Sequence, residues 1–456
     1  MDRPDGMHKF LSHAKINNIA ASNEACSGEG FSRMVFFAMD QFSMSIEIIV
    51  VILFTIIVSW SIYHTPIMIL GLMTFKRRKT FHDCVMNDAY EPSVSVIIPV
   101  KNGAKTLDRL MASLLAVDYP KEKMEIIFVE DGSTDGSYEI CKSYEKKFPG
   151  LVKVFHRDQS RGKPDALWYA TGRASGEILV VFDVDSVIDP KAFKLALRRF
   201  KDERVAAVQG RTISMNFRSN LLTLLVYLEE LWFSLILMGK QRLGLFKPLT
   251  GNCMFIRKSY LEKVGGWDRN SLTEDVELSV RLIKHGYVII YEKEVKCLQE
   301  APARLKHLMR QRNRWYRGYL ETLMKSLRLL RGFDLKFFDS VILLSSPIIA
   351  ILGQILYPLV IVASMLVPHS PFVNLILQSS LILLIFSLLA VMSVVVILFK
   401  PGRIRLLTCS LAIYLYWWLL SLIALKSCLD MIMRTPKRWI TTPKEGGAWP
   451  ISSPIG

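Results

Sequence analysis

The sequence contains few cysteines, and none of them stands in a spacing that binds metal. Its 456 residues include seven cysteines, with no CxxC pair and no zinc-finger spacing. These cysteines therefore give no indication of a zinc site. We expect them to be reduced and, for the most part, to pack in the protein interior.

Several motifs that bind nucleotides or perform nucleophilic catalysis are also missing. No GxGxxG or GxxxxGK[ST] pattern occurs, which argues against a dinucleotide-binding fold and a phosphate-binding P-loop. No Ser-His-Asp arrangement and no internal repeat is evident. The formal net charge is +17, but there is no nucleic-acid-binding motif and no repeated basic and aromatic face. We therefore expect no nucleic-acid partner.

Long apolar runs, in contrast, are abundant. Hydrophobic residues make up 51% of the chain, and they concentrate in one block near the N-terminus and in nearly everything from Val341 to Met433. Ile46 to Met73 is long and apolar enough to span a bilayer. Basic residues gather beside the apolar blocks, as they do on cytoplasmic flanks and near anionic lipid headgroups. The pattern predicts an integral protein of the cell (plasma) membrane that contacts membrane lipids.

The apolar blocks divide the chain into parts. We expect a poorly ordered leader without the shape of a signal peptide (1–45), a transmembrane helix (46–75), a cytosolic domain (80–318), an interfacial amphipathic helix (319–337), about three transmembrane helices (338–433) and a basic tail (434–456). The basic run Lys76 to Lys79 places the domain in the cytoplasm. Three full spans after the domain would put the basic tail outside, against the positive-inside rule. Either one block does not cross fully or the tail is an exception, and we favour a cytoplasmic tail.

Strands and helices alternate in the first half of the domain. Four strands are expected at 94–99, 124–129, 152–155 and 178–182. Their alternation with helices predicts an α/β fold with a parallel sheet and helices on both faces. The apolar segment Leu221 to Phe246 is interrupted by charges, and we expect a helix that packs in the domain or lies at the membrane face.

Acidic side chains follow two of these strands. Asp131 follows the second strand, and Asp183 and Asp185 follow the fourth. Ligands of such sheets bind outside the carboxyl ends of the strands. Carboxylates at i and i+2 on a turn can face one Mg²⁺ or Mn²⁺ ion, which would in turn hold a diphosphate; an ordinary acidic turn is the alternative. Lys163, on a nearby loop, could reach a phosphate or be solvated surface charge.

The stretch from Thr273 to Trp315 carries charged groups at both of its ends. Glu274 and Asp275 precede an apolar helical pattern, so they lie near a helix N-terminus, where a carboxylate is favoured and can serve as a base. Gln311, Arg314 and Trp315 are spaced i, i+3 and i+4 and share one helix face. That face could hold a charged leaving group and stack on a ring. The alternatives are a helix cap, a surface cation and a core tryptophan.

Together, these motifs resemble the family 2 inverting glycosyltransferases. The similarity is greatest to the membrane-integrated branch that includes cellulose, chitin, hyaluronan and poly-N-acetylglucosamine synthases. Between Ser93 and about Gly318 the family's motifs occur in order: Val-Ser-Val-Ile-Ile-Pro-Val, Val-Glu-Asp-Gly-Ser-Thr-Asp, Asp-Val-Asp, Thr-Glu-Asp and Gln-Arg-x-Arg-Trp. The resemblance implies a GT-A-like nucleotide-sugar-binding domain with a parallel-rich mixed sheet, flanked by transmembrane and interfacial helices. Lys101-Asn-Gly departs from the family, where many members have Asn-Glu after an aromatic residue.

The resemblance also implies a role for each candidate residue. On the donor side, Asp131 would contact the uracil of a UDP-sugar, Lys163 and Asp183 would help hold the donor, and Asp185, with Asp183, would bind Mg²⁺ or Mn²⁺. On the acceptor side, Asp275, beside Glu274, would be the base that deprotonates the acceptor hydroxyl. Gln311, Arg314 and Trp315 would line the diphosphate and acceptor site. The turn Gly251-Asn252-Cys253 resembles the family's loop beside the acceptor sugar.

Two products are compatible with these expectations. A membrane-embedded enzyme would add sugars from a UDP-sugar to the non-reducing end of a β-linked polysaccharide and could extrude it, with inversion from an α-linked donor. A non-processive enzyme would place one sugar on a lipid or lipid-linked acceptor, which the small number of spans favours. A non-catalytic transporter or scaffold is disfavoured by the intact carboxylates. An oligomer could complete a channel, and the Thr-Thr-Pro-Lys tail segment could close over the site or lie on lipid headgroups.

Overall fold

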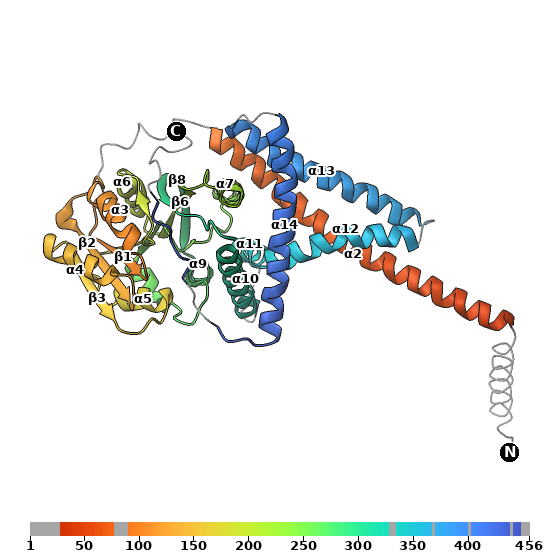
Figure 1. The fold of residues 1–456 in the computed structure, drawn as a ribbon, viewed down its shortest axis with the longest axis horizontal. Helices are drawn as coiled ribbons and strands as arrows, with labels where there is room; N and C mark the ends of the chain where they lie inside the picture. The colour runs from red at the N-terminus through yellow and green to blue at the C-terminus, as the bar shows by residue number, and fades with distance from the viewer. Residues whose placement is uncertain are drawn as a thin grey trace, which may run out of the picture. The chain divides into compact units, whose positions relative to one another are not determined.

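The computed structural model describes residues 28–76, 90–327, 334–366, 370–399, 403–437 and 441–447. They form two compact units (Figure 1). The first unit contains the described part of Met1–Ser59 together with Leu352–Phe386. The second contains the described parts of Trp60–Ile351 and Ser387–Gly456, and it holds the sheet and every candidate site residue.

The second unit is built on an eight-stranded mixed sheet with the order β3-β2-β1-β4-β7-β6-β8-β5. Its strands are β1 (Val94–Val100), β2 (Met124–Asp131), β3 (Val152–Arg157), β4 (Ile178–Val181), β5 (Val187–Ile188), β6 (Val205–Ser214), β7 (Met254–Arg257) and β8 (Val288–Gln299). The first four strands run parallel, as the alternation of strands and helices predicts. β7 is antiparallel to both β4 and β6, whereas β6 and β8 are parallel. This is the expected parallel-rich mixed sheet.

Helices cover both faces of this sheet because alternate strand residues point to opposite sides and are apolar on both. One core cluster joins the sheet to α3 (Ala104–Leu115), α4 (Ser137–Lys147) and α6 (Ala192–Leu197). The other joins it to α5 (Lys163–Thr171), α8 (Lys258–Lys263) and α9 (Glu274–Lys284). Two short 3₁₀ turns lie at Lys121–Lys123 and Arg198–Lys201.

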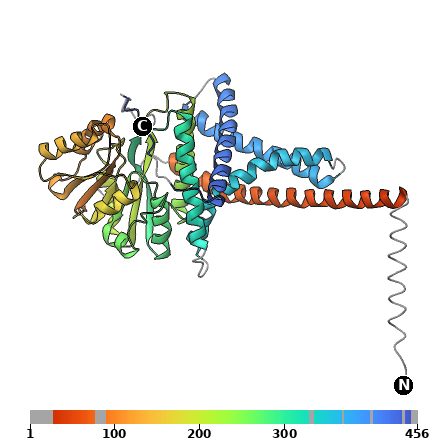
Figure 2. The ribbon, with the colours of Figure 1, turned by 60° about the horizontal axis from the view of Figure 1, so that its bottom comes forward.

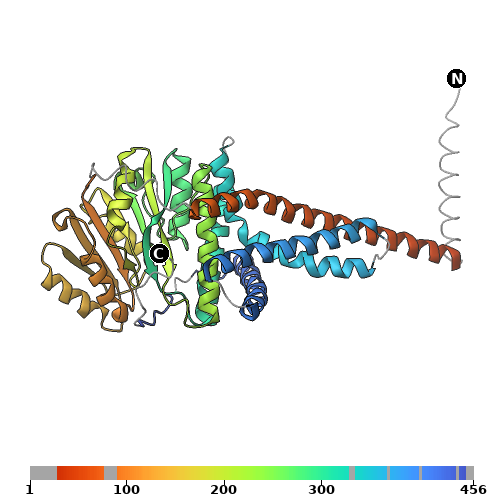
Figure 3. The same ribbon diagram turned by 90° about the horizontal axis from the view of Figure 1, so that it is seen from above.

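Three longer helices follow: α7 (Leu221–Arg242) packs against the sheet, α10 (Leu305–Leu327) packs against α9, and α14 (Arg403–Ile432) packs against α10 and α7 (Figures 1 and 2). Figure 3 shows α7, in light green, next to the sheet. α7 begins at a reciprocal cap between Asn220 and Thr223, and it packs against β6 and β8. α10 and α14 are joined by the amide of Asn313, which donates to Asp430 over 3.0 Å.

The expected interfacial helix at 319–337 differs in the structure. Residues 319–327 continue α10, so they share one helix with Gln311 and Trp315, and α11 (Leu335–Leu344) follows. Residues 328–333 lie outside the described part. α10 runs in contact with the domain at Gly318, where a Cβ would lie 2.5 Å from the Thr273 side chain.

Five helices in the described residues are long and apolar enough to cross a membrane: Asp40–Phe75, Leu221–Arg242, Ser346–Leu366, Pro371–Leu389 and Leu411–Ile432. They lie in α2 (Gly28–Lys76), α7, α12 (Ser346–Leu366), α13 (Pro371–Phe399) and α14. α2 begins at Gly28, so part of the expected leader is helical; residues 1–27 lie outside the described part. More than half of the α7 window is buried within the protein, in keeping with a helix packed in the domain.

Candidate active site

The predicted acidic residues meet at one edge of the sheet. β1, β2 and β4 are parallel neighbours, so their carboxyl ends lie at the same edge. Asp131 is the last residue of β2, and the turn from Asp183 to Ser186 follows β4. Strand geometry therefore brings together side chains that are about fifty residues apart in the sequence.

Asp131 is buried, and its carboxylate organises the loop that follows β3. It accepts hydrogen bonds from the guanidinium of Arg157 at 2.5 Å, the hydroxyl of Ser160 at 2.7 Å and the backbone N–H of Gly162 at 3.1 Å. The loop ends at Gly162, where α5 begins with Lys163. Asp131 thus shapes the segment that presents Lys163, and its predicted contact with a uracil base remains a prediction.

Lys163 lies at the centre of the site. Its ammonium forms an ion pair with Asp183 and donates to the carbonyl oxygen of Gly251 at 2.5 Å. Burial alone would lower its pKa, but the nearby carboxylates of Asp183 and Glu274 outweigh burial and raise the pKa of Lys163. A cation is therefore held between the strand β4 turn and the Gly251 loop.

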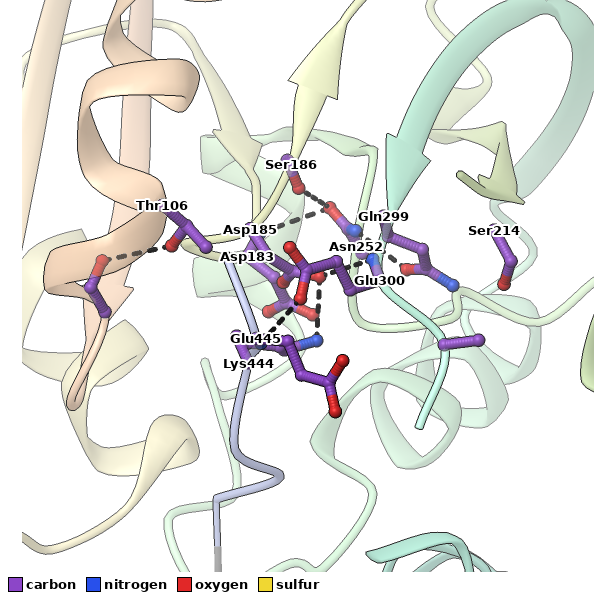
Figure 4. A network of polar contacts seen from close by, with 12 residues as sticks. Thr106, Asp183, Asp185, Ser186, Ser214, Asn252, Gln299, Glu300, Lys444 and Glu445 are labelled. Carbon is purple, nitrogen blue, oxygen red and sulfur yellow. Dashed lines mark hydrogen bonds and ion pairs between the residues drawn. The ribbon is translucent and has the colours of Figure 1, made fainter. Parts of the chain in front are cut away.

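Asp185 is fully buried, and one of its oxygens has no protein partner (Figure 4). Oδ2 accepts from the backbone N–H of Glu300 at 2.7 Å and from the Lys444 ammonium at 2.8 Å, whereas Oδ1 has no hydrogen-bond partner among the described residues. An unpartnered buried carboxylate oxygen fits a hard cation. The described residues hold no cluster of three or more His, Cys, Asp or Glu side chains suited to a metal. A divalent cation at Asp185 would therefore draw further ligands from a bound diphosphate, as Mg²⁺ commonly does.

Glu274 and Asp275 stand at the N-terminus of α9, as predicted. Glu274 is buried and Asp275 is half-buried. Loss of solvation raises the pKa of each carboxyl, and the charge of Asp275 adds to this effect and raises the pKa of Glu274 to about 7. A Cβ at Gly251 would lie 2.9 Å from Oδ2 of Asp275 and 3.5 Å from the Lys163 ammonium. Asp275 therefore faces the same loop that Lys163 binds, and a carboxyl with a raised pKa suits a general base.

Comparison with known proteins agrees with this geometry. Residues 92–318 match the family described as "Glycosyltransferase like family 2". This part of the chain is similar to that family. The match covers the whole sheet and ends at the close contact of α10 with the domain, so the GT-A-like fold and the family match concern the same residues.

The relatives include enzymes with different products. The chain is 32% identical over 241 residues to the probable glycosyltransferase YdaM of Bacillus subtilis. It is 29% identical over 283 residues to a beta-monoglucosyldiacylglycerol synthase of Nostoc, and 30% identical over 234 residues to a poly-beta-1,6-N-acetyl-D-glucosamine synthase of Staphylococcus epidermidis. These matches cover 52%, 58% and 51% of the chain, and 57%, 57% and 56% of the three relatives, respectively.

A solved structure shares the fold over most of the chain. The mannosyltransferase PcManGT from Pyrobaculum calidifontis, in complex with GDP-Man and Mn²⁺, aligns with a TM-score of 0.60 and 18% identity. The alignment covers 86% of this chain and 100% of that chain. At this identity the likeness concerns the fold alone.

The Gln-Arg-Asn-Arg-Trp motif lies on α10, as predicted, but its side chains have separate environments. Arg314 donates from Nη1 to the carbonyl oxygen of Leu272 at 3.0 Å, next to the two carboxyls of α9. Trp315 stacks instead against the guanidinium of Arg312, 4.1 Å from its ring centroid. Gln311 is half-buried on the same helix. Their roles toward diphosphate and acceptor remain predictions.

Within the Gly251-Asn252-Cys253 turn, the first residue lies against Lys163 and Asp275. Gly251 has a φ of 78°, a backbone conformation that suits glycine, and it faces Lys163 and Asp275. The Asn252 side chain is buried and binds the turn after β4, and the Cys253 thiol is fully buried in the core beside Cys297. A contact between Cys253 and an acceptor would therefore use its backbone rather than its thiol.

The C-terminal segment is part of the site, which the sequence indicated only as a tail that could close over it. Glu300 accepts from the backbone N–H of Glu445 at 2.8 Å (Figure 4). It also accepts from the guanidinium of Arg109 at 2.7 Å. Lys444 is thereby held on Asp185. The tail therefore lies on the same side of the molecule as the domain that holds the sheet. Arg109 and Glu300 carry no sequence motif that would have marked them.

Removing the Lys444 ammonium is expected to strengthen cation binding at Asp185. In Lys444→Gln, Mn²⁺ no longer competes with an ion-paired ammonium, so its affinity should rise about fivefold, or ~1 kcal/mol. The measurement is an electron paramagnetic resonance titration with Mn²⁺ on the purified protein in the presence of UDP, which supplies the diphosphate ligands. Lys437→Gln, whose partner Glu321 lies on α10, serves as the control. Equal Mn²⁺ affinity in wild type and Lys444→Gln would contradict the expectation.

Proposed function

We propose that this chain is a membrane-embedded inverting glycosyltransferase that transfers a sugar from a UDP-sugar to the non-reducing end of a growing β-linked polysaccharide. The carrying observation is the arrangement around Lys163. This cation joins the carboxylate turn after β4 to the Gly251 loop, and Asp275 also faces Gly251. The residues proposed to hold the donor and the residue proposed as the base therefore meet at the Gly251 loop.

The residues then divide the chemistry between them. Asp275 accepts the proton of the acceptor hydroxyl, and the oxygen attacks the anomeric carbon from the face opposite the diphosphate. Lys163 and Arg314 supply positive charge where negative charge develops on the leaving group. A Mg²⁺ or Mn²⁺ ion bound at Asp185, with Asp183 beside it, would supply further charge neutralisation. The sugar is inverted because attack and departure occur on opposite faces.

A location in the cell (plasma) membrane, with the domain in the cytoplasm, is supported by the apolar helices and the basic residues beside them. The five helices that could cross a membrane include three in the C-terminal part of the chain. The tail contacts Asp185 and Glu300, so the segment after α14 is on the side of the domain. That placement supports the cytoplasmic tail expected from the positive-inside rule.

A second candidate function is transfer of a single sugar to a lipid or lipid-linked acceptor. It is favoured by one relative, whose name describes synthesis of a glucosylated diacylglycerol, and by the small number of helices available for a channel. The site chemistry is the same for both acceptors. An oligomer could supply the missing channel helices for a polymer.

A donor screen tests the proposal and separates the two products. Purified protein in detergent, with Mg²⁺ or Mn²⁺, is offered UDP-glucose, UDP-N-acetylglucosamine and GDP-mannose, and nucleotide release and product size are followed. We expect a high-molecular-weight product from one UDP-sugar. A solvent-extractable product with one sugar would establish the lipid-directed function, and the absence of turnover with every donor would refute the enzyme proposal.

The paired carboxyls predict a pH dependence. Since the pKa of Glu274 is raised to about 7, its carboxyl ionises as pH rises through that value, and the new negative charge makes Asp275 a stronger base. We expect kcat/KM to rise with pH through about 7. In Glu274→Gln, which mimics the protonated form, this rise should be absent and the acid limb should lie at lower pH. Glu277→Gln, which removes a carboxylate paired with Arg281, should keep the wild-type profile; a midpoint unchanged in Glu274→Gln would disprove the coupling.

A further inference from the structure

A chain of three side chains connects α7 to the carboxylate turn after β4. Glu230 of α7 accepts through Oε1 from the Gln299 amide at 2.9 Å. Gln299 in turn accepts through Oε1 from the Asn252 amide at 3.0 Å. Asn252 then accepts through Oδ1 from the backbone N–H of Asp183 at 3.2 Å and the hydroxyl of Ser186 at 3.0 Å (Figure 4).

Both ends of this chain of side chains are fixed by groups that can only donate. At one end the backbone N–H of Ser214 donates to Oε2 of Glu230 at 2.9 Å. At the other end the N–H groups of Asp183 and Cys253 donate to Oδ1 of Asn252, the second at 2.8 Å. A primary amide donates at one end and accepts at the other, so it transmits the direction of hydrogen bonding. Between two obligatory donors, such a chain is consistent only if one member accepts at both ends.

Glu230 is that member, since a carboxylate accepts at both of its oxygens. We propose that Glu230 is a positioning residue: its carboxylate sets the orientation of Gln299 and Asn252, and thereby holds the turn that carries Asp183 and Asp185. The inference rests on the proposed function of that turn in donor and cation binding. It also links α7 to the site through hydrogen bonds.

The consequence of removing the charge follows from the same reasoning. In Glu230→Gln, the amide oxygen must face Ser214 N–H, so its NH₂ group faces Gln299 and forces that amide to turn. Gln299 would then present NH₂ to the NH₂ of Asn252. Turning Asn252 as well would point its NH₂ group at the N–H groups of Asp183 and Cys253. Every arrangement leaves two donors opposed, which costs about 1–3 kcal/mol in a buried position.

A charge exchange within the chain provides the test. Gln299→Glu alone places two carboxylates against each other, but Glu230→Gln with Gln299→Glu restores one acceptor at both ends and keeps the net charge of the wild type. Glu230→Gln with Asn252→Asp also restores a consistent direction. A residue that acted only through packing would not be rescued by either exchange. This makes the two double variants matched controls for the single ones.

The readouts do not depend on sugar transfer. We expect faster hydrogen–deuterium exchange at residues 183–186 and 252–254, and about 10- to 100-fold weaker Mn²⁺ binding, in Glu230→Gln and in Gln299→Glu. Both double variants should return to within about threefold of wild type. Wild-type behaviour of the single variants, or double variants that fold poorly or show no recovery, would overturn the inference. If the wild type transfers no sugar, the proposed function fails. The hydrogen–deuterium exchange of the variants still tests whether Glu230 positions the turn.

Discussion

Asp275→Asn is expected to lower kcat by about 10²- to 10⁴-fold, the usual contribution of a general base. Asp275 is the carboxyl that faces the Gly251 loop and Lys163, so it is the group placed to receive the acceptor proton. Asparagine has almost the same shape but cannot accept that proton. The measurement is single-turnover sugar transfer with saturating donor and metal, which separates the chemical step from product release.

This substitution should leave the fold intact. Oδ1 of Asp275 accepts from the backbone N–H of Val276 at 2.8 Å, and an asparagine oxygen can accept the same hydrogen bond. Asp268→Asn, which removes a carboxylate paired with Lys325 away from the Gly251 loop, is the matched control and should retain wild-type turnover. Turnover of Asp275→Asn within about threefold of wild type would show that another group is the base.

The parts of the site that follow from local rules could be predicted from the sequence. Asp131 and Asp183 follow apolar strand runs, and the rule that parallel strands place their carboxyl ends at one edge brings them together. The helical pattern after Thr273 places Glu274 and Asp275 at a helix start. Each of these predictions needs only the period of a strand or helix and the topology of a parallel sheet.

Contacts between distant segments could not be predicted in this way. Lys444 reaches Asp185 across 259 positions, and Glu230 reaches Gln299 across 69. Neither contact leaves a periodic pattern, because each depends on the side-chain geometry of folded elements. The strands β6, β7 and β8 were likewise not predicted. β7 is only four residues long, and the long β6 and β8 do not follow the simple strand and helix alternation of the first half.

The junction of α9 and α10 shows how local and distant features combine. Gly318 permits α10 to approach Thr273, and Arg314, one turn earlier on the same helix, binds the carbonyl oxygen of Leu272. The two contacts hold the helix start that presents Glu274 and Asp275. Arg314, for which the sequence suggested a contact with diphosphate, therefore also has a structural role: it joins α10 to the loop that precedes Glu274 and Asp275.

Asp185→Asn is expected to weaken Mn²⁺ binding by at least about 100-fold, more than substitutions of supporting residues commonly do. Oδ1 of Asp185 is a buried carboxylate oxygen without a hydrogen-bond partner in the part of the chain that the structure describes, and its charge is what a hard cation requires. Asparagine can keep the hydrogen bond from Glu300 N–H to the other oxygen, so the turn should be retained. The measurement is a Mn²⁺ titration in the presence of UDP, followed by metal-dependent sugar transfer.

Comparing Asp185→Asn with Lys444→Gln distinguishes a loss of cation binding from a loss of stability. Both substitutions break the ion pair between Asp185 and Lys444, but only one removes the negative charge. If the pair mattered merely for stability, both variants would bind Mn²⁺ equally and unfold at similar temperatures. If Asp185 holds the cation, their Mn²⁺ affinities should move in opposite directions. Asp189→Asn is the control: Asp189 lies after the turn, its carboxylate accepts from the backbone N–H of Lys191, and its substitution should leave the Mn²⁺ affinity unchanged.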